Sequence, residues 1–147
     1  MTKSELARKN FEDGCNCCQS VVLAFAEEMG LTRETATLLS AGLGGGVGRL
    51  REICGAVSGA AIVLGMLHGS PDPRDRERKA ALYAEIQRLA AAFAARHGSY
   101  ICRDLLGLPP GADDPVPGER TSAYYAARPC AGLVASMAEL IEQEIAE

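Results

Sequence analysis

The sequence predicts an all-α protein, a single-domain bundle of about five to seven helices over residues 1–147. The composition favours helices, because 24 Ala and 16 Leu stand against 18 β-branched residues that show no period-2 alternation. Helix start and stop signals also recur along the whole chain, with no internal repeat and no linker. A chain of this length buries about 70% of its unfolded surface, so it needs no disulfide or metal to fold.

Four helices are expected in the first half of the chain. Thr2 or Ser4 caps the first, and Gly30 is the stop signal of the second. Thr32 caps the third, which leads into a Gly-rich tight turn at residues 42–48. The fourth is apolar nearly all round and rich in small residues, which predicts a central buried helix that packs closely on a neighbouring helix, a cofactor or a dimer partner. The first of these helices should end near residue 14, and the other three should span about residues 16–29, 33–43 and 54–67.

The second half is expected to contain one long helix and several shorter elements. Asp72 is the expected N-cap of the long helix, Pro73 its first residue, and Gly98 follows its end. Residues 109–117 hold four of the seven prolines and should be irregular. The remaining helices should span about 100–106 and 119–127, and the last should begin at Pro129.

Charge and hydropathy exclude several classes of protein. A net charge of −4 and a mean hydropathy of +0.02 describe a soluble globular domain rather than a basic nucleic-acid binder. The most apolar stretch, residues 54–67, is too short to cross a bilayer, and the polar N-terminus lacks a signal peptide. We therefore expect a cytoplasmic protein with no membrane span and no nucleic-acid partner.

Six cysteines are the feature that core packing does not explain. Cys15 and Cys18 have C-x₂-C spacing, but no second pair follows and no strand precedes, which argues against a zinc ribbon or a thioredoxin-like site. Gln19 stands where c-type haem attachment needs His, so we expect no haem. Free N–H groups at a helix N-terminus stabilise a thiolate, the form that ligates metals and attacks disulfides. Four cysteines lie at separate expected helix starts: Cys17, Cys54, Cys102 and Cys130.

These residues resemble a bacterial four-cysteine family of putative redox-active proteins, C_GCAxxG_C_C, defined by a Cys-Gly-Ala-x-x-Gly motif. The motif stands here as Cys54-Gly55-Ala56-Val57-Ser58-Gly59, with Gly55, Ala56 and Gly59 as its supporting residues. Its other matches are Gly14-x-Asn16-Cys17-x-Gln19, Gly44-Gly45-Gly46 with Arg49, Cys102-Arg103-Asp104-Leu105-Leu106-Gly107 and Cys130. The resemblance covers roughly residues 10–140.

The resemblance implies a redox-active or metal-binding site made of the four matched cysteines. A related domain accompanies an iron–sulfur-type centre in the split-Soret cytochromes c, whose haem-binding sequence this chain lacks. Cys15 and Cys18 depart from the family pattern, and we treat them as accessory ligands or incidental thiols. The implied cofactor is an iron–sulfur cluster or another thiolate-bound metal.

Two other functions stay open at this point. Metal-free thiol–disulfide chemistry could use Cys15, Cys17 and Cys18, because one thiol would attack and another resolve. Alternatively, the chain is a non-catalytic helical interaction domain, a homodimer with incidental cysteines. A redox protein would also need a redox partner, which the sequence does not identify. We expect Tyr124 and Tyr125 to anchor the Pro-rich segment on the bundle, where the segment could instead form a lid over the cysteines.

Overall fold

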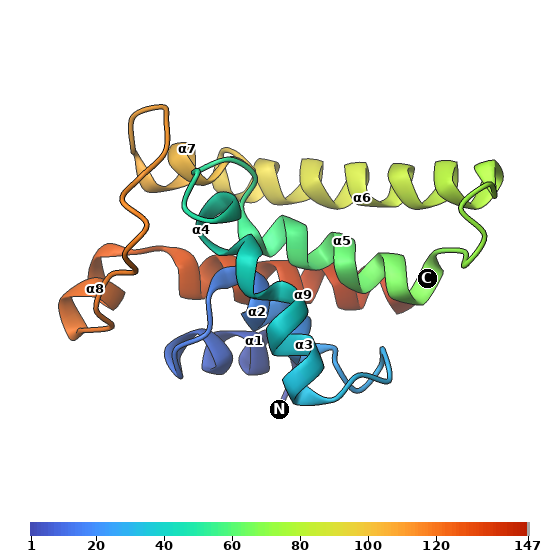
Figure 1. The fold of residues 1–147 in the computed structure, drawn as a ribbon, viewed down its shortest axis with the longest axis horizontal. Coiled ribbons are helices and arrows are strands. Elements are labelled where there is room, and N and C mark those ends of the chain that lie inside the picture. The colour runs from blue at the N-terminus through green and yellow to red at the C-terminus, as the bar shows by residue number, and fades with distance from the viewer. Residues whose placement is uncertain (147) are drawn as a thin grey trace.

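The computed structural model describes residues 1–146 and confirms a single all-α domain (Figure 1). Within those residues it has no strand, only an isolated antiparallel bridge between Ile53 and Ile101. The elements are α1 Lys3–Glu12, α2 Cys17–Ala24, α3 Arg33–Ser40, η1 Ala41–Leu43, α4 Gly44–Val47, α5 Gly55–His68, α6 Arg76–His97, α7 Cys102–Leu106, α8 Ser122–Ala127 and α9 Cys130–Ala146. Residues 1–146 thus divide into more segments than the expected five to seven, because α4, α7 and α8 are each a turn or two long.

Two helix boundaries differ from the expected ones. The second helix ends at Ala24 rather than near residue 29, because the N–H of Phe25 bonds back only three residues, to the Val22 carbonyl, and the chain then turns. The long helix α6 is capped by Asp75, whose carboxylate accepts the N–H of Arg78 at 3.0 Å. Asp72, the expected cap, instead accepts the N–H of residue 74 in a turn before the helix.

The core lies where α1, α2, α5 and α9 meet, and α6 covers α5 and α9 on one side (Figure 1). Few aromatic side chains fill this core, so small residues bring the helices close. A Cβ on Gly59 of α5 would lie 2.9 Å from the Cβ of Val21 on α2, which only glycine avoids. Met66 of the same helix is 56% exposed, so burial of α5 on all sides is not confirmed. The largest fully buried side chains are Phe11, Phe25, Phe93, Leu64, Met137 and Ile141.

The short elements gather at one end of the bundle, on the left in Figure 1. There α7 follows the end of α6, and residues 107–121, which we call the 107–121 segment, run from α7 to α8. Helix α9 begins directly beyond α8 at the same end. This end therefore collects several helix starts. No helix in the described part of the chain is both long and apolar enough to cross a membrane.

Candidate functional site

The four family-matched cysteines lie at four helix starts around one cavity of about 430 Å³. Cys54 is the N-cap of α5. The other three are the first residues of their helices: Cys17 of α2, Cys102 of α7 and Cys130 of α9. All four line the cavity, whereas Cys15 and Cys18 do not. The fold thus brings together four thiols that are far apart in the sequence.

Cys54 and Cys102 are held beside each other by the small antiparallel bridge. Ile53 pairs with Ile101, the N–H of Cys54 donates to the Tyr100 carbonyl at 2.9 Å, and the N–H of Cys102 donates to the Glu52 carbonyl at 2.6 Å. Side chains alternate between the two faces of paired extended segments, so those directly after the bridged residues share one face. That face carries both sulfurs to the cavity.

Cys17 is positioned by the cap of α2 and by the closeness of α5. Asn16 and Gln19 form a capping box, in which the Asn16 side chain accepts the N–H of Gln19 at 2.8 Å and the Gln19 side chain accepts the N–H of Asn16 at 3.0 Å. A Cβ on Gly55 would lie 2.8 Å from the backbone nitrogen of Cys18 and 3.0 Å from the Cβ of Cys17. The glycine of the motif is therefore needed for the starts of α2 and α5 to meet.

The Gly-rich turn before α5 is left-handed. Gly45, Gly46 and Gly48 have φ values of 68°, 68° and 54°, and non-glycine residues follow the same path: Val47 at 67°, Arg49 at 63° and Arg51 at 61°. A non-glycine residue in this region costs about 1–2 kcal/mol, and such strain concentrates at functional sites. The turn confirms the tight turn expected at residues 42–48, and Arg49 and Arg51 at its end both line the cavity.

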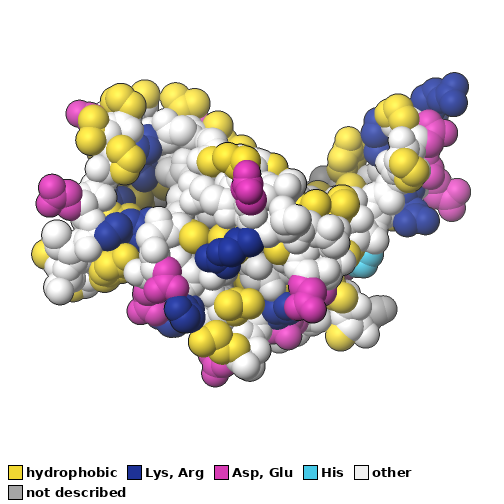
Figure 2. Space-filling view, turned by 60° about the horizontal axis from the view of Figure 1, so that its bottom comes forward, with side chains coloured by type: hydrophobic (Ala, Val, Ile, Leu, Met, Phe, Trp, Pro, Cys, Tyr) yellow, Lys and Arg dark blue, Asp and Glu magenta, His cyan; other side chains and the backbone are white. Residues whose placement is uncertain are grey.

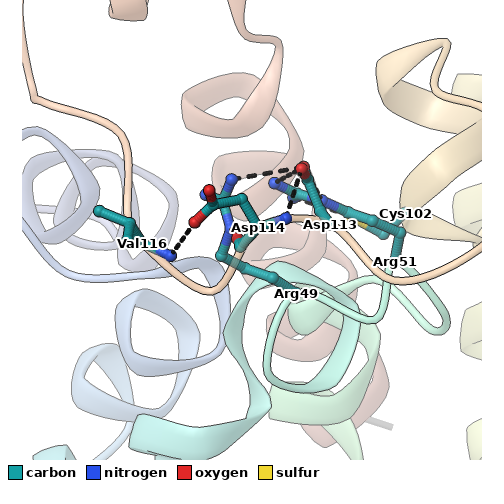
Figure 3. A network of polar contacts seen from close by, with 6 residues as sticks. All are labelled: Arg49, Arg51, Cys102, Asp113, Asp114 and Val116. Carbon is teal, nitrogen blue, oxygen red and sulfur yellow. Dashed lines mark hydrogen bonds and ion pairs between the residues drawn. The ribbon is translucent and has the colours of Figure 1, made fainter.

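Arg51 joins the cysteine site to the 107–121 segment (Figure 3). The residue is 4% exposed, and its Nη1 lies 3.6 Å from the Sγ of Cys102. Its Nε and Nη2 donate to Oδ2 of Asp113 at 3.1 and 3.0 Å, while Arg49 Nη2 reaches the same oxygen at 3.3 Å. Asp113 is therefore the carboxylate that ties the segment down.

Two further arginines line the cavity from the α8 side. Arg120 donates to the backbone carbonyls of Phe11 and Cys15, both at 2.8 Å, and its guanidinium lies 4.3 Å from the centre of the Phe11 ring. Arg128 lies over the ring of Tyr124, at 5.3 Å. In the described part of the chain neither arginine has a carboxylate partner, so their charges are left for the cavity. Figure 2 shows Lys and Arg atoms recessed at the left end of the molecule.

The two tyrosines of α8 hold this region on the bundle, as expected. Tyr124 stacks on Phe11 with ring centres 6.4 Å apart, and Tyr125 packs edge-on against the same ring. The Tyr125 hydroxyl donates to the Glu12 carbonyl at 3.0 Å. Pro115, Pro117 and Gly118 of the 107–121 segment line the cavity, so this segment also borders the cysteine site.

The Cys130 and Cys17 thiols interact with each other, and their pKa values shift in opposite directions. A hydrogen bond with Cys17 is the largest of the influences that together lower the pKa of Cys130 to about 7, against the effect of burial. The charges of Arg128, Arg120 and Arg51 contribute to the same lowering. The same hydrogen bond, together with burial, raises the pKa of Cys17 well above its usual value. At pH 7 the Cys130 thiol is therefore about half ionised, while the Cys17 thiol stays protonated.

Burial keeps three further thiols protonated, those of Cys15, Cys18 and Cys54. Burial raises the pKa of Cys54 to about 12, although the N–H groups of Ala56 and Val57 favour its thiolate. Burial likewise raises the pKa of Cys18 to about 12 and raises that of Cys15. Against the expectation that each helix start would stabilise a thiolate, the pKa of Cys17 is raised chiefly by its hydrogen bond with Cys130, and that of Cys54 is raised chiefly by burial.

The cavity lining has a distinctive composition. It contains four cysteines and four arginines, and neither a carboxylate nor an imidazole among the described residues. Across residues 1–146, no group of three or more His, Cys, Asp or Glu side chains is arranged to hold a metal ion. The sequence motif pointed to Arg49 as a residue of the site, but not to Arg51, Arg120 or Arg128. The signal available for the last two was their position on either side of the tyrosine pair.

Comparison with known proteins returns one family. Residues 15–144 match the model described as "Putative redox-active protein (C_GCAxxG_C_C)", nearly the whole chain. No curated protein and no solved structure gives a match. The matched range contains the four cysteines of the cavity and the turn that precedes α5. The chain therefore belongs to the C_GCAxxG_C_C family that this model describes.

Proposed function

We propose that the protein is a thiol–disulfide redox protein whose reactive groups are Cys130 and Cys17. The observation that carries the proposal is the placement of both thiols in one cavity, at the starts of α2 and α9, and their opposite pKa shifts support it. A thiolate near neutral pH is the attacking species in disulfide exchange, and a second thiol in contact with it can resolve the mixed disulfide. The pair crosses from α2 to α9, rather than using the C-x₂-C spacing of the sequence.

The reaction requires a disulfide substrate and transfers two electrons to it. The Cys130 thiolate attacks one substrate sulfur, the substrate S–S bond breaks, and the first thiolate leaves and takes a proton. The Cys17 sulfur, after losing its proton to solvent, attacks the Cys130 sulfur of the mixed disulfide. The second substrate thiol is then released. The Cys17–Cys130 dithiol is oxidised to a disulfide, and the substrate disulfide is reduced to two thiols.

The test is to oxidise the reduced full-length protein in dithiothreitol redox buffers under argon and to map disulfides by mass spectrometry. One disulfide, joining Cys17 to Cys130, should form and be reversible. Cys130→Ser and Cys17→Ser should each abolish it. Cys15→Ser is the matched control, because Cys15 is only half-buried and does not line the cavity, and it should leave the disulfide unchanged. A dominant disulfide between any other two cysteines would overturn the assignment.

A second candidate function is an iron–sulfur electron carrier held by Cys17, Cys54, Cys102 and Cys130. The donor set favours it, since four thiols line the cavity and iron–sulfur clusters are bound by cysteine thiolates. The four arginines would offset the negative charge of such a centre. The cluster would supply one-electron transfer. Another thiolate-bound metal at the same four cysteines is the alternative that this donor set also allows.

Anaerobic purification separates these candidates. Visible absorption with iron and acid-labile sulfide in the protein would support the cluster, and zinc analysis would detect another metal. Colourless protein that takes up neither iron nor sulfide on reconstitution would overturn the cluster and leave the dithiol. Intact partner binding by a variant with all four cysteines changed to serine would instead support the non-catalytic interaction domain.

We also propose the setting in which the dithiol would work. A reducing compartment such as the cytoplasm keeps thiols available for exchange. A redox partner must return the dithiol to its reduced form after each cycle. The homodimer expected from the sequence stays a prediction, which sedimentation equilibrium can check.

A further inference from the structure

We propose that the cavity beside Cys130 binds small disulfides that carry carboxylates, so that the protein reduces anionic disulfides in preference to neutral or cationic ones. This inference rests on the proposed dithiol function and names its class of substrate. The structural basis is the uncompensated positive charge that the lining arginines place next to the reactive pair.

The charge balance of the cavity is positive. Four guanidinium groups line it, and the ion pairs of Arg49 and Arg51 converge on a single carboxylate, Asp113. Arg120 is held by neutral backbone carbonyls, and Arg128 contacts an aromatic ring. Even when one cysteine of the cavity is a thiolate, the cationic side chains of the lining outnumber the anionic ones. Charges of one sign in a cleft with low-dielectric walls concentrate ligands of the opposite sign.

The size and the walls of the cavity suit a small organic molecule. Its volume of about 430 Å³ lies within the range of small-molecule sites and exceeds the space that two sulfur atoms occupy. Leu105, Leu106 and Leu133 supply apolar wall, as do the Tyr124 and Phe11 rings. Cationic groups combined with apolar wall match a ligand that has a short hydrocarbon body and carboxylate ends.

The arginines are also in the right place for the chemistry. Arg128 lies two residues before Cys130, and both it and Arg120 act electrostatically on the Cys130 sulfur. A carboxylate bound by either arginine would hold the attached disulfide next to the thiolate. The exchange then follows the balanced steps given above, with the anionic disulfide as oxidant and two anionic thiols as products.

The test compares disulfide probes that differ in charge. The dianionic 5,5′-dithiobis(2-nitrobenzoate) and the neutral 4,4′-dithiodipyridine both report thiol release by absorbance, and 3,3′-dithiodipropionate and cystamine form an aliphatic pair of opposite charge. Each rate with the protein is divided by the rate of the same probe with dithiothreitol, which removes intrinsic reactivity. We expect the normalised rates to favour the anionic probes by at least about tenfold at low salt. This preference should shrink as ionic strength rises.

Variants connect the preference to the arginines. Arg128→Gln should lower the anionic-to-neutral ratio, and the ratio cancels any change in the reactivity of Cys130 itself, because both probes meet the same thiolate. Arg120→Gln is a second variant, although it also removes two backbone contacts. Arg74→Gln, on an exposed side chain remote from the cavity, is the control and should leave the ratio unchanged.

The outcomes separate this inference from the function on which it rests. Equal normalised rates for all probes, with a Cys17–Cys130 disulfide as product, would overturn the charge selectivity and leave the dithiol function standing. An anionic preference that is unchanged in Arg128→Gln and in Arg120→Gln would overturn the role of these arginines. It would likewise leave the dithiol function standing. Absence of reaction at Cys130 with every probe would overturn the proposed function itself.

Discussion

Removing the hydrogen bond from Cys17 should sharply reduce the reactivity of Cys130. That bond is the largest of the influences that together lower the pKa of the Cys130 thiol from the ordinary 9.0 to about 7. Without it, burial raises the pKa of Cys130 while the arginines lower it, so the pKa should return toward the ordinary 9.0. At pH 7 the thiolate fraction would then fall from about one half to about 1%, which makes the thiol roughly 50-fold less reactive in the Cys17→Ala variant.

The assay is the pH dependence of alkylation of Cys130 by iodoacetamide, followed by peptide mass spectrometry. In the native protein the rate should rise with a midpoint near pH 7, because a lowered pKa exposes the thiolate at lower pH. The Cys17→Ala midpoint should move up by about two units. Cys17→Ser is the matched control, since its hydroxyl can still donate to Cys130, and its midpoint should lie between the other two.

The reasoning would be refuted by a Cys17→Ala midpoint that stays near 7. The low pKa would then come from the arginines alone. A midpoint above 9 in the native protein would refute it more directly, because burial would then dominate the pair. Far-ultraviolet circular dichroism of each variant shows that the fold is retained while these rates are compared.

Two further changes test the turn and the 107–121 segment. In Gly46→Ala the new Cβ would lie 2.5 Å from the Glu52 nitrogen at a φ of 68°, so overlap and strain together should cost about 2–5 kcal/mol in urea unfolding. In Gly48→Ala the new Cβ meets no atom within 4 Å, so the free energy of unfolding should fall by only about 1–2 kcal/mol. Equal losses in the two variants would contradict the steric argument. Asp113→Asn should weaken the ion pairs to both arginines of the turn and make the segment a faster site of limited proteolysis. Asp72→Asn removes a carboxylate from an exposed ion pair and should leave cleavage of the segment unchanged. If Asp113→Asn were cleaved no faster than the native protein, Asp113 would not be what holds the segment in place.

The fold class could be predicted because its signals are local. Caps such as Thr2 and Thr32 act within a few residues, and the structure confirms both. The end of α2 and the start of α6 could not be predicted in the same way. At Phe25 the ring is buried in the core, and the chain turns there in spite of an apolar sequence that would continue a helix.

The cysteines of the site could be predicted, but their electrostatics could not. Cys17 and Cys130 are visible in the sequence as residues at helix starts. Their hydrogen bond joins α2 to α9, and no sequence spacing encodes it. The place of Arg51 in the site could not be predicted either, because a long charged residue normally lies on the surface. Here it is 4% exposed and lies between a thiol and a carboxylate.

The glycines around the site allow its backbone segments to pack closely. Gly55 lets the start of α5 contact α2, and a Cβ on Gly46 would overlap the backbone of Arg51. The turn carbonyls then accept the next backbone groups, with Gly45 bonded to the N–H of Arg51 and Gly46 to that of Glu52. Glu52 in turn accepts the N–H of Cys102. A continuous run of backbone contacts therefore leads from the left-handed turn to a cysteine of the cavity, and the strain of the turn is the cost of holding a buried arginine against that sulfur.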